Sequence, residues 1–222
     1  MANAFFGLTI TIFALEVGKW INKKTKSSLA NPLLIAMILV IAVLHLFKIP
    51  LETYELGGSI LTFFFPLVTV ALALSIYRQR AVLKEYFIPI AIGTLVGSAV
   101  ATGSAIFLSK LLGLDELIVR SLASKSVTTP VSVALTEQIG GLPALTIAST
   151  VITGLAGNLL APYIGKVLGI KDRVAHGVAI GTSSHALGTS KAFELGDVEG
   201  SMSSISISFS ALWTTIIFAI IF

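Results

Sequence analysis

The sequence predicts an all-α polytopic membrane protein with about six transmembrane helices and two re-entrant helical hairpins, which enter from opposite faces as an inverted repeat. The 222 residues are 55% hydrophobic and only 12% charged, whereas a soluble domain usually carries roughly 25% charged residues. The charged residues fall in short clusters between long apolar runs. This distribution is typical of a chain that crosses a lipid bilayer several times.

Six apolar runs approach or exceed the length that the roughly 30 Å hydrocarbon layer requires. They are residues 4–21, 32–48, 58–77, 86–112, 143–165 and 200–222. Lysine and arginine cluster after the first, third and fifth runs, and cytoplasmic loops collect such residues. We therefore expect a multi-pass plasma-membrane protein with an external N-terminus and an external loop at 48–57.

This charge pattern makes residues 113–142 unusual, because they must leave and return to the same membrane face. The span before them ends outside, and the span after them must begin outside. Leu114–Ala123 as a helix would be about 15 Å long, roughly half the hydrocarbon thickness. Pro130 suits the first turn of a second half-helix, 130–137. The stretch is therefore predicted to be a re-entrant hairpin that enters from outside.

A second polar break, "GTSSHALGTSK", begins at Gly181 and ends at Lys191. Charge alone leaves open whether residues 174–199 cross the membrane or form a hairpin. The Ser-, Thr- and Gly-rich break between short apolar pieces favours a hairpin entering from inside, with its second half-helix at 189–195.

An internal similarity supports the two hairpins. Residues 109–129 align with 165–185 at a constant offset of 56, with four identities. They are Lys110/Lys166, Leu112/Leu168, Gly113/Gly169 and Ala123/Ala179. Because the preceding spans run in opposite directions, the copies are predicted to be inverted, as in many secondary transporters.

The predicted organisation is a set of scaffold helices followed by a transport unit. The scaffold is 1–84 and the transport unit is 85–222. Within the latter, 85–140 and 143–199 are the repeats and 200–222 is a final helix.

The two breaks are predicted to meet and bind a small anion. A half-helix that begins within the membrane has unpaired N–H groups and a positive end, and neither break contains a carboxylate. The candidate substrate-binding residues are Lys125, Ser126, Thr128, Thr129, Ser183, Ser184, His185, Thr189, Ser190 and Lys191. Some of the hydroxyls have an alternative role in helix packing, and Lys191 has one as an ion-pair partner of Glu194.

Several function classes find no support in the sequence. Cysteine is absent, and there is no zinc pattern, phosphate-binding loop or dinucleotide fingerprint. We expect no metal or cofactor, no nucleic-acid partner and no enzyme activity. The adjacent pairs Lys125–Ser126 and Ser184–His185 lack the third, orienting group of a catalytic nucleophile.

Two motifs resemble the signature regions of the LrgB/CidB family, "KSVTTPVSVALTEQIGG" and "GTSSHALGTSKAFELGDVEGSMSSIS". Lys125 matches the family's lysine in the first motif, and Ser184–His185 its Ser-His pair. Bacterial members are known as antiholin-like or murein-hydrolase regulators that act with a small LrgA/CidA-type membrane protein. A plastid relative carries glycolate and glycerate, and bacterial relatives are tied to pyruvate uptake. The resemblance thus implies a bacterial cell-membrane location and a separate LrgA/CidA-type partner.

The expected function is secondary transport of small monocarboxylates, such as pyruvate, glycolate, glycerate or lactate, by a homo-oligomer, most simply a dimer. The alternative is a holin- or antiholin-like regulator of lysis and murein hydrolase activity. Such a regulator acts by assembly and needs no saturable substrate flux.

Overall fold

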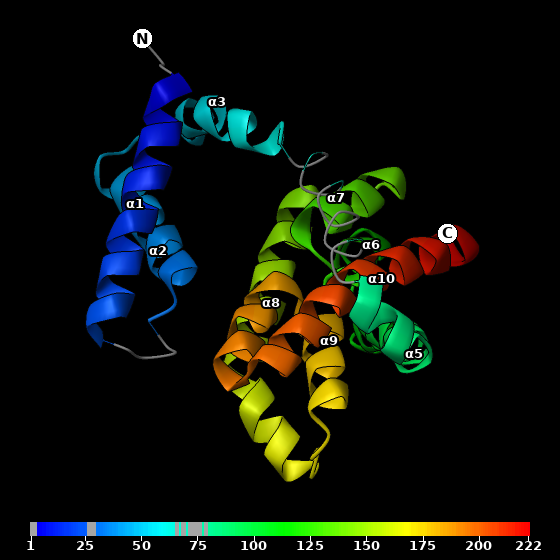
Figure 1. The fold of residues 1–222 in the computed structure, drawn as a ribbon. Coiled ribbons are helices and arrows are strands. Elements are labelled where there is room, and N and C mark those ends of the chain that lie inside the picture. The colour runs from blue at the N-terminus through cyan, green and yellow to red at the C-terminus, as the bar shows by residue number, and fades with distance from the viewer. Residues whose placement is uncertain (1–3, 26–29, 65–66, 68–69, 71–76, 78–79) are drawn as a thin grey trace. The chain divides into compact units, whose positions relative to one another are not determined.

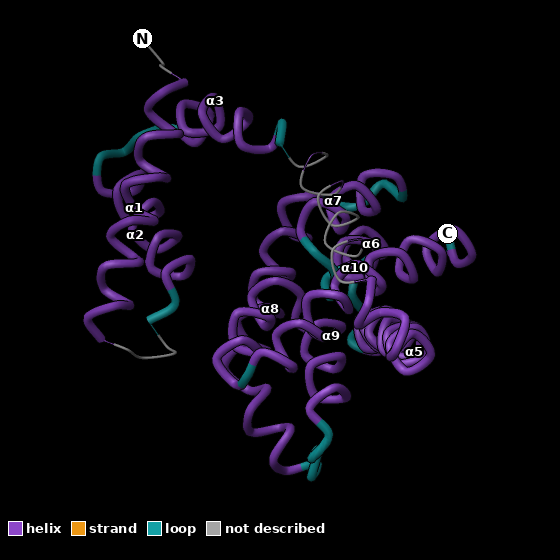
Figure 2. The backbone as a smooth tube through the Cα atoms, in the orientation of Figure 1, coloured by secondary structure: helices purple, strands orange, loops and turns teal. Residues whose placement is uncertain are grey.

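The structure is a computed structural model that describes residues 4–25, 30–64, 67, 70, 77 and 80–222. The described residues form helices joined by turns, and none of them lies in a strand (Figure 2). They divide into two compact units, 1–67 and 68–222. The predicted all-α class is confirmed.

The described residues of the first unit include α1 (Ala4–Thr25), α2 (Pro32–Leu46) and α3 (Leu51–Thr62). α1 packs against both other helices, and Asn31 caps α2 by accepting a hydrogen bond from the backbone N–H of Leu33 at 2.9 Å. The predicted external loop at 48–57 is wrong in extent, because α3 already begins at Leu51. Most of the predicted third span, 58–77, lies outside the described residues.

The second unit contains the helices of both predicted hairpins (Figure 1). They are α5 (Arg80–Leu111), α6 (Glu116–Ala123), α7 (Thr129–Gln138), α8 (Pro143–Val167), α9 (Arg173–Leu195) and α10 (Asp197–Ile221). Within the described part of the chain, α5, α8 and α10 are long and apolar enough to cross a membrane, whereas α2 is apolar but shorter. These helices agree with a helical membrane protein.

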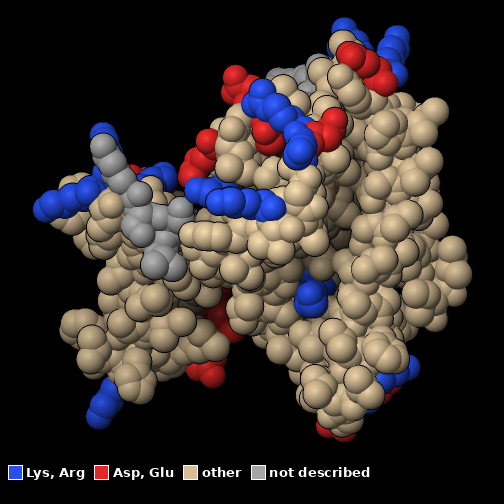
Figure 3. Space-filling model, turned by 90° about the horizontal axis from the view of Figure 1, so that it is seen from below, with Lys and Arg blue, Asp and Glu red and all other residues tan. Residues whose placement is uncertain are grey.

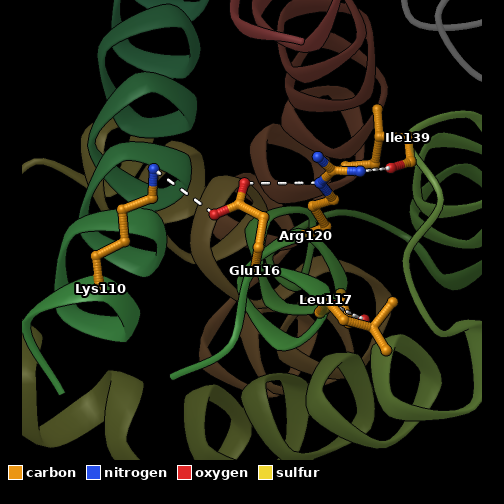
Figure 4. Close-up of polar contacts among 6 residues, drawn as sticks. Lys110, Glu116, Leu117, Arg120 and Ile139 are labelled. Atoms are coloured by element: carbon orange, nitrogen blue, oxygen red, sulfur yellow. Dashed lines mark hydrogen bonds and ion pairs between the residues drawn. The ribbon is translucent and has the colours of Figure 1, made fainter. Parts of the chain in front are cut away.

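The first break is flanked by two short helices, as predicted. α6 has 8 residues and α7 has 10, and polar contacts join α6 to the end of α5 and to the end of α7 (Figure 4). Oε2 of Glu116 lies 3.9 Å from Nζ of Lys110 at the end of α5, and Oε1 of Glu116 lies 3.6 Å from Nε of Arg120. Arg120 also donates a hydrogen bond of 3.0 Å to the carbonyl oxygen of Ile139. These contacts close the open end of the hairpin.

The chain also reverses inside α9, at His185, where φ is 41° and ψ is −142°. A carbon at the Cβ position of Gly188 would lie 3.1 Å from Cγ2 of Ile180. Eight residues of continuous helix would separate these positions by about 12 Å, so the two arms of α9 lie side by side. The second break is therefore present, but its second arm begins after His185 rather than at the predicted Thr189.

α10 supports both hairpins. Met202, Ile205 and Phe209 pack with residues of α5 and α9, and further along α10 Ala211 and Phe218 pack with α6 and α7. At its start, Glu199 accepts hydrogen bonds of 2.8 to 3.1 Å from the guanidinium group of Arg173. The predicted final helix is thus the central helix of this unit.

The long helices of the two predicted repeats end in the same way. Gly113 and Gly169, 56 positions apart, have φ values of 69° and 65°. Each donates to the carbonyl oxygen three residues back, and the following residue donates to the one five back. This is a glycine C-cap that an L-residue adopts only with strain. The shared geometry explains the glycine identity found by the alignment.

Candidate functional site

The first break, residues 124–128, places an ammonium group and hydroxyls beside an open helix N-terminus. Thr128 is the N-cap residue of α7, and its side chain makes no capping hydrogen bond. The first N–H groups of a helix have no partner within it, and Pro130 in the first turn contributes none. Lys125 and Ser126 are partly exposed, whereas Thr128 is buried. These groups are suited to an anion.

A network of buried hydroxyl groups holds this break against α8. Oγ of Ser124 lies 2.8 Å from Oγ of Ser132 and 3.1 Å from Oγ1 of Thr136. Thr146 donates to Oγ1 of Thr136 at 3.0 Å, and Oγ of Ser132 lies 3.4 Å from Oγ1 of Thr150. All five side chains are at most 1% exposed. Because a buried hydroxyl without a partner costs about 1–3 kcal/mol, the network stabilises the relative positions of α6, α7 and α8.

The second break contacts the same turn of α8. Nε2 of His185 lies 2.9 Å from the carbonyl oxygen of Thr150. Because a carbonyl oxygen only accepts, Nε2 carries the proton in this arrangement. Gly154 permits the contact, since a Cβ there would lie 2.8 Å from Nε2 of His185. Thr150 therefore connects the two hairpins, through its hydroxyl to Ser132 and through its carbonyl to His185.

A cavity of about 660 Å³ reaches both breaks. Lys125 and Ser126 line it from the first hairpin, and Ser183 and Ser184 line it from the second. The other lining residues belong to α5, α8, α9 and the turn before α9, and most of them are apolar or glycine. Among the described residues that line the cavity, Lys125 is the one Lys or Arg, and none is acidic.

The other six predicted site residues do not line this cavity. They are Thr128, Thr129, His185, Thr189, Ser190 and Lys191. Thr128 and His185 are buried, and each lies within two residues of a lining residue in the sequence. Thr129 is the first residue of α7. Both breaks therefore reach one cavity, but only some of the predicted residues in each break line it.

Helix packing and an ion pair occupy the three predicted residues of the second arm. Oγ1 of Thr189 donates to the carbonyl oxygen of His185 and lies 2.7 Å from Oγ of Ser203. Ser190 donates to the carbonyl oxygen four residues back. Lys191 donates to Glu194 at 2.6 Å. For all three residues the structure shows the alternative roles that the sequence left open.

Sequence reasoning missed three polar residues that fix the breaks from neighbouring helices. Thr150 contacts Ser132 and His185, Ser203 contacts Thr189, and Nδ2 of Asn158 donates to the carbonyl oxygen of Leu187 at 2.9 Å. Their signal was present, since each is a polar residue inside a predicted apolar span. Such residues face the bundle interior in membrane proteins.

Charged side chains lie in separate groups on the face drawn in Figure 3. Figure 3 shows one face on which most of the surface is uncharged and the Lys, Arg, Asp and Glu side chains gather in patches. An uncharged exterior of this kind agrees with a helical protein in a lipid bilayer.

Comparison with known proteins decides the family. Residues 9–222 match the LrgB-like family. The chain belongs to that family. The LrgB/CidB resemblance of the two motifs is thus confirmed, and the match takes in both units.

Relatives resemble this LrgB-like chain over nearly their whole length. It is 36% identical to the uncharacterized protein YwbG of Bacillus subtilis (strain 168) over 207 residues, 93% of this chain and 92% of that protein. It is 31% identical to the antiholin-like protein LrgB of Bacillus mycoides (strain KBAB4) over 214 residues, 96% and 93% of the two chains. No solved structure matches the chain.

Proposed function

We propose that this LrgB-like chain is a secondary carrier of small monocarboxylates of the pyruvate, glycolate, glycerate or lactate type. The observation that supports it is the cavity shared by the two breaks, with Lys125 as its one Lys or Arg and no acidic residue among the described lining residues. A carboxylate would offset the charge of Lys125 and accept hydrogen bonds from Ser126 and Ser184. The substrate is therefore an anion with a single carboxylate.

In this proposal the hairpins are re-entrant and related by inversion. Both tips lie near the bilayer midplane, and movement of the transport unit, residues 85–222, against the scaffold, residues 1–84, exposes the cavity to each side in turn. The protein is a multi-pass protein of the bacterial cell membrane with an external N-terminus. It forms a homo-oligomer, most simply a dimer, and acts with a small LrgA/CidA-type membrane protein.

Cysteine labelling tests the re-entrant topology, and the chain has no native cysteine to interfere. Asp115→Cys and Gln138→Cys place thiols at exposed positions on either side of the first hairpin. We expect a membrane-impermeant maleimide to label both from outside intact cells. Lys171→Cys and Asp197→Cys, which flank the second hairpin, should react only after the cells are opened. Labelling of positions 115 and 138 from opposite sides would show that α6 and α7 together cross the membrane.

Uptake by proteoliposomes of the purified full chain tests the function. We expect labelled pyruvate or glycolate to enter with saturable kinetics and to be displaced by the unlabelled acid. Uptake that rises linearly with concentration, and equals that of empty liposomes for every short-chain acid, would contradict the carrier.

A second candidate function is antiholin-like regulation of lysis, which the name of a relative at 31% identity favours. Such a regulator would act through assembly with a membrane partner and would need no cavity chemistry. It predicts that the chain alters cell lysis equally well when the cavity residues are replaced. Loss of both uptake and lysis control in the same cavity variant would instead make lysis control a consequence of transport.

A further inference from the structure

The cavity is a trough whose hydroxyl groups and single lysine gather toward one end. On α8 its lining includes Gly157, Ala161 and Gly165, and on α5 it includes Gly93 and Ala101. On each helix the first and last of these positions are eight residues apart, which corresponds to about 12 Å. The trough is thus longer than a two- or three-carbon acid.

The two ends of the trough can be identified from close contacts between α8 and α9. Gly157 faces Ser184, whereas Gly165 faces His176, which lies eight residues earlier on α9. His185, next to Ser184, contacts Thr150, and Thr150 also contacts Ser132, which holds the first break. Ser184 is therefore assigned to the end nearer Lys125 and Ser126, and Gly165, further along α8, to the opposite end. Lys125 and most of the hydroxyl groups therefore lie toward one end, whereas the imidazole of His176 lies at the other.

The remainder of the trough is mostly apolar and is open along one side. Val96 and Val100 of α5, and Leu160 and Ile164 of α8, line it and are each about half exposed. Its volume of about 660 Å³ falls within the range of pockets that enclose drug-sized ligands. A small acid held at Lys125 would leave most of this apolar surface uncovered.

We infer that the trough binds monocarboxylates with an apolar tail of about four to eight carbons, and binds them more tightly than pyruvate or glycolate. The inference rests on the proposed function, since the carboxylate occupies the same polar end. The tail extends from Ser184 toward His176 along the face of α8 that carries Ala161. Each methylene that leaves water strengthens binding by up to about fourfold.

A chain-length series tests the inference. The full-length protein in lipid nanodiscs is titrated by calorimetry with acetate, butanoate, hexanoate, octanoate and dodecanoate, and empty nanodiscs give the heat of partitioning into lipid. We expect the affinity to rise about fourfold per methylene and to level off by octanoate, when the trough of about 12 Å is full. Equal affinity for acetate and hexanoate would overturn the inference. An affinity that still rises at the same rate to dodecanoate would also overturn it, because it would assign the trough to membrane lipid tails.

A matched pair of variants on α8 locates the tail. Ala161→Phe should fill the middle of the trough and lower hexanoate affinity at least tenfold, while binding of pyruvate at the polar end stays within twofold. Ile152→Phe adds a ring to the same helix at an exposed position outside the trough and should change neither affinity. Equal hexanoate affinity in both variants would exclude a tail in the trough.

The outcomes also separate this inference from the proposed function. Binding and uptake of pyruvate without any dependence on chain length would leave the carrier intact and remove the tail site. Failure of pyruvate and of every acid in the series to bind would remove both.

Discussion

Lys125→Ala should lower the affinity of the protein for pyruvate about 10- to 100-fold and reduce uptake into proteoliposomes to the level of empty vesicles. A hydrogen bond to a charged group contributes about 1.5–3 kcal/mol, and each 1.4 kcal/mol corresponds to a factor of about ten in affinity. Among the described residues that line the cavity, no second Lys or Arg can replace the lost charge.

Lys191→Ala is the matched control for this loss. Lys191 also lies in a predicted break, but it pairs with Glu194 at 2.6 Å and does not line the cavity. Its removal should leave affinity within about twofold, because an ion pair between neighbouring helical residues contributes only about 0.2–0.5 kcal/mol. Both variants should elute from gel filtration like the parent protein. Equal losses of uptake in the two variants would show that Lys125 has no special role.

Gly181→Ala should destabilise the second unit more than any other single methyl group added to α9. A Cβ at Gly181 would lie 2.8 Å from the Cα and carbonyl carbon of Ser203 in α10. These are backbone atoms, which cannot move aside as the end of a long side chain can. Overpacking of this kind costs about 1–3 kcal/mol, so the midpoint of thermal unfolding in detergent should fall by several degrees.

Gly103→Ala makes the same chemical change in α5 and should have the opposite effect. No atom lies within 4 Å of a Cβ at Gly103, and alanine is favoured over glycine in a helix by up to about 1 kcal/mol. We therefore expect an unchanged or slightly higher unfolding temperature. If Gly181→Ala were as stable as Gly103→Ala, the close packing of α9 on α10 would be wrong.

The two short helices around the first break were predictable almost to the residue, and the position of the second break was not. Predicted half-helices at 114–123 and 130–137 correspond to Glu116–Ala123 and Thr129–Gln138, because Pro130 marks a helix start by its own ring geometry. In the second hairpin the positive φ belongs to His185, whereas Gly181 and Gly188 lie within the arms. These glycines are needed for close packing, on Ser203 and on Ser184, so they gave no signal for the position of the turn.

The candidate site shows the same division between local and tertiary information. Lys125, Ser126, Ser183 and Ser184 line the cavity, whereas Thr189 meets Ser203, 14 residues further along the chain. A serine or threonine in a break can bind a ligand or a neighbouring helix equally well. Which role it has depends on the helix that packs against it.

The sequence by itself determined the helical membrane class, the family, the two polar breaks and the absence of carboxylates from them, because hydropathy, charge and proline geometry act over neighbouring residues. Only the tertiary structure decided that α10 is the central support, that Thr150 connects the two hairpins and that Lys125 shares a cavity with Ser184. Those features depend on contacts between residues far apart in the chain. Such contacts form where glycines allow two helices to approach closely. The order of residues in a single sequence does not show which helices pack against each other.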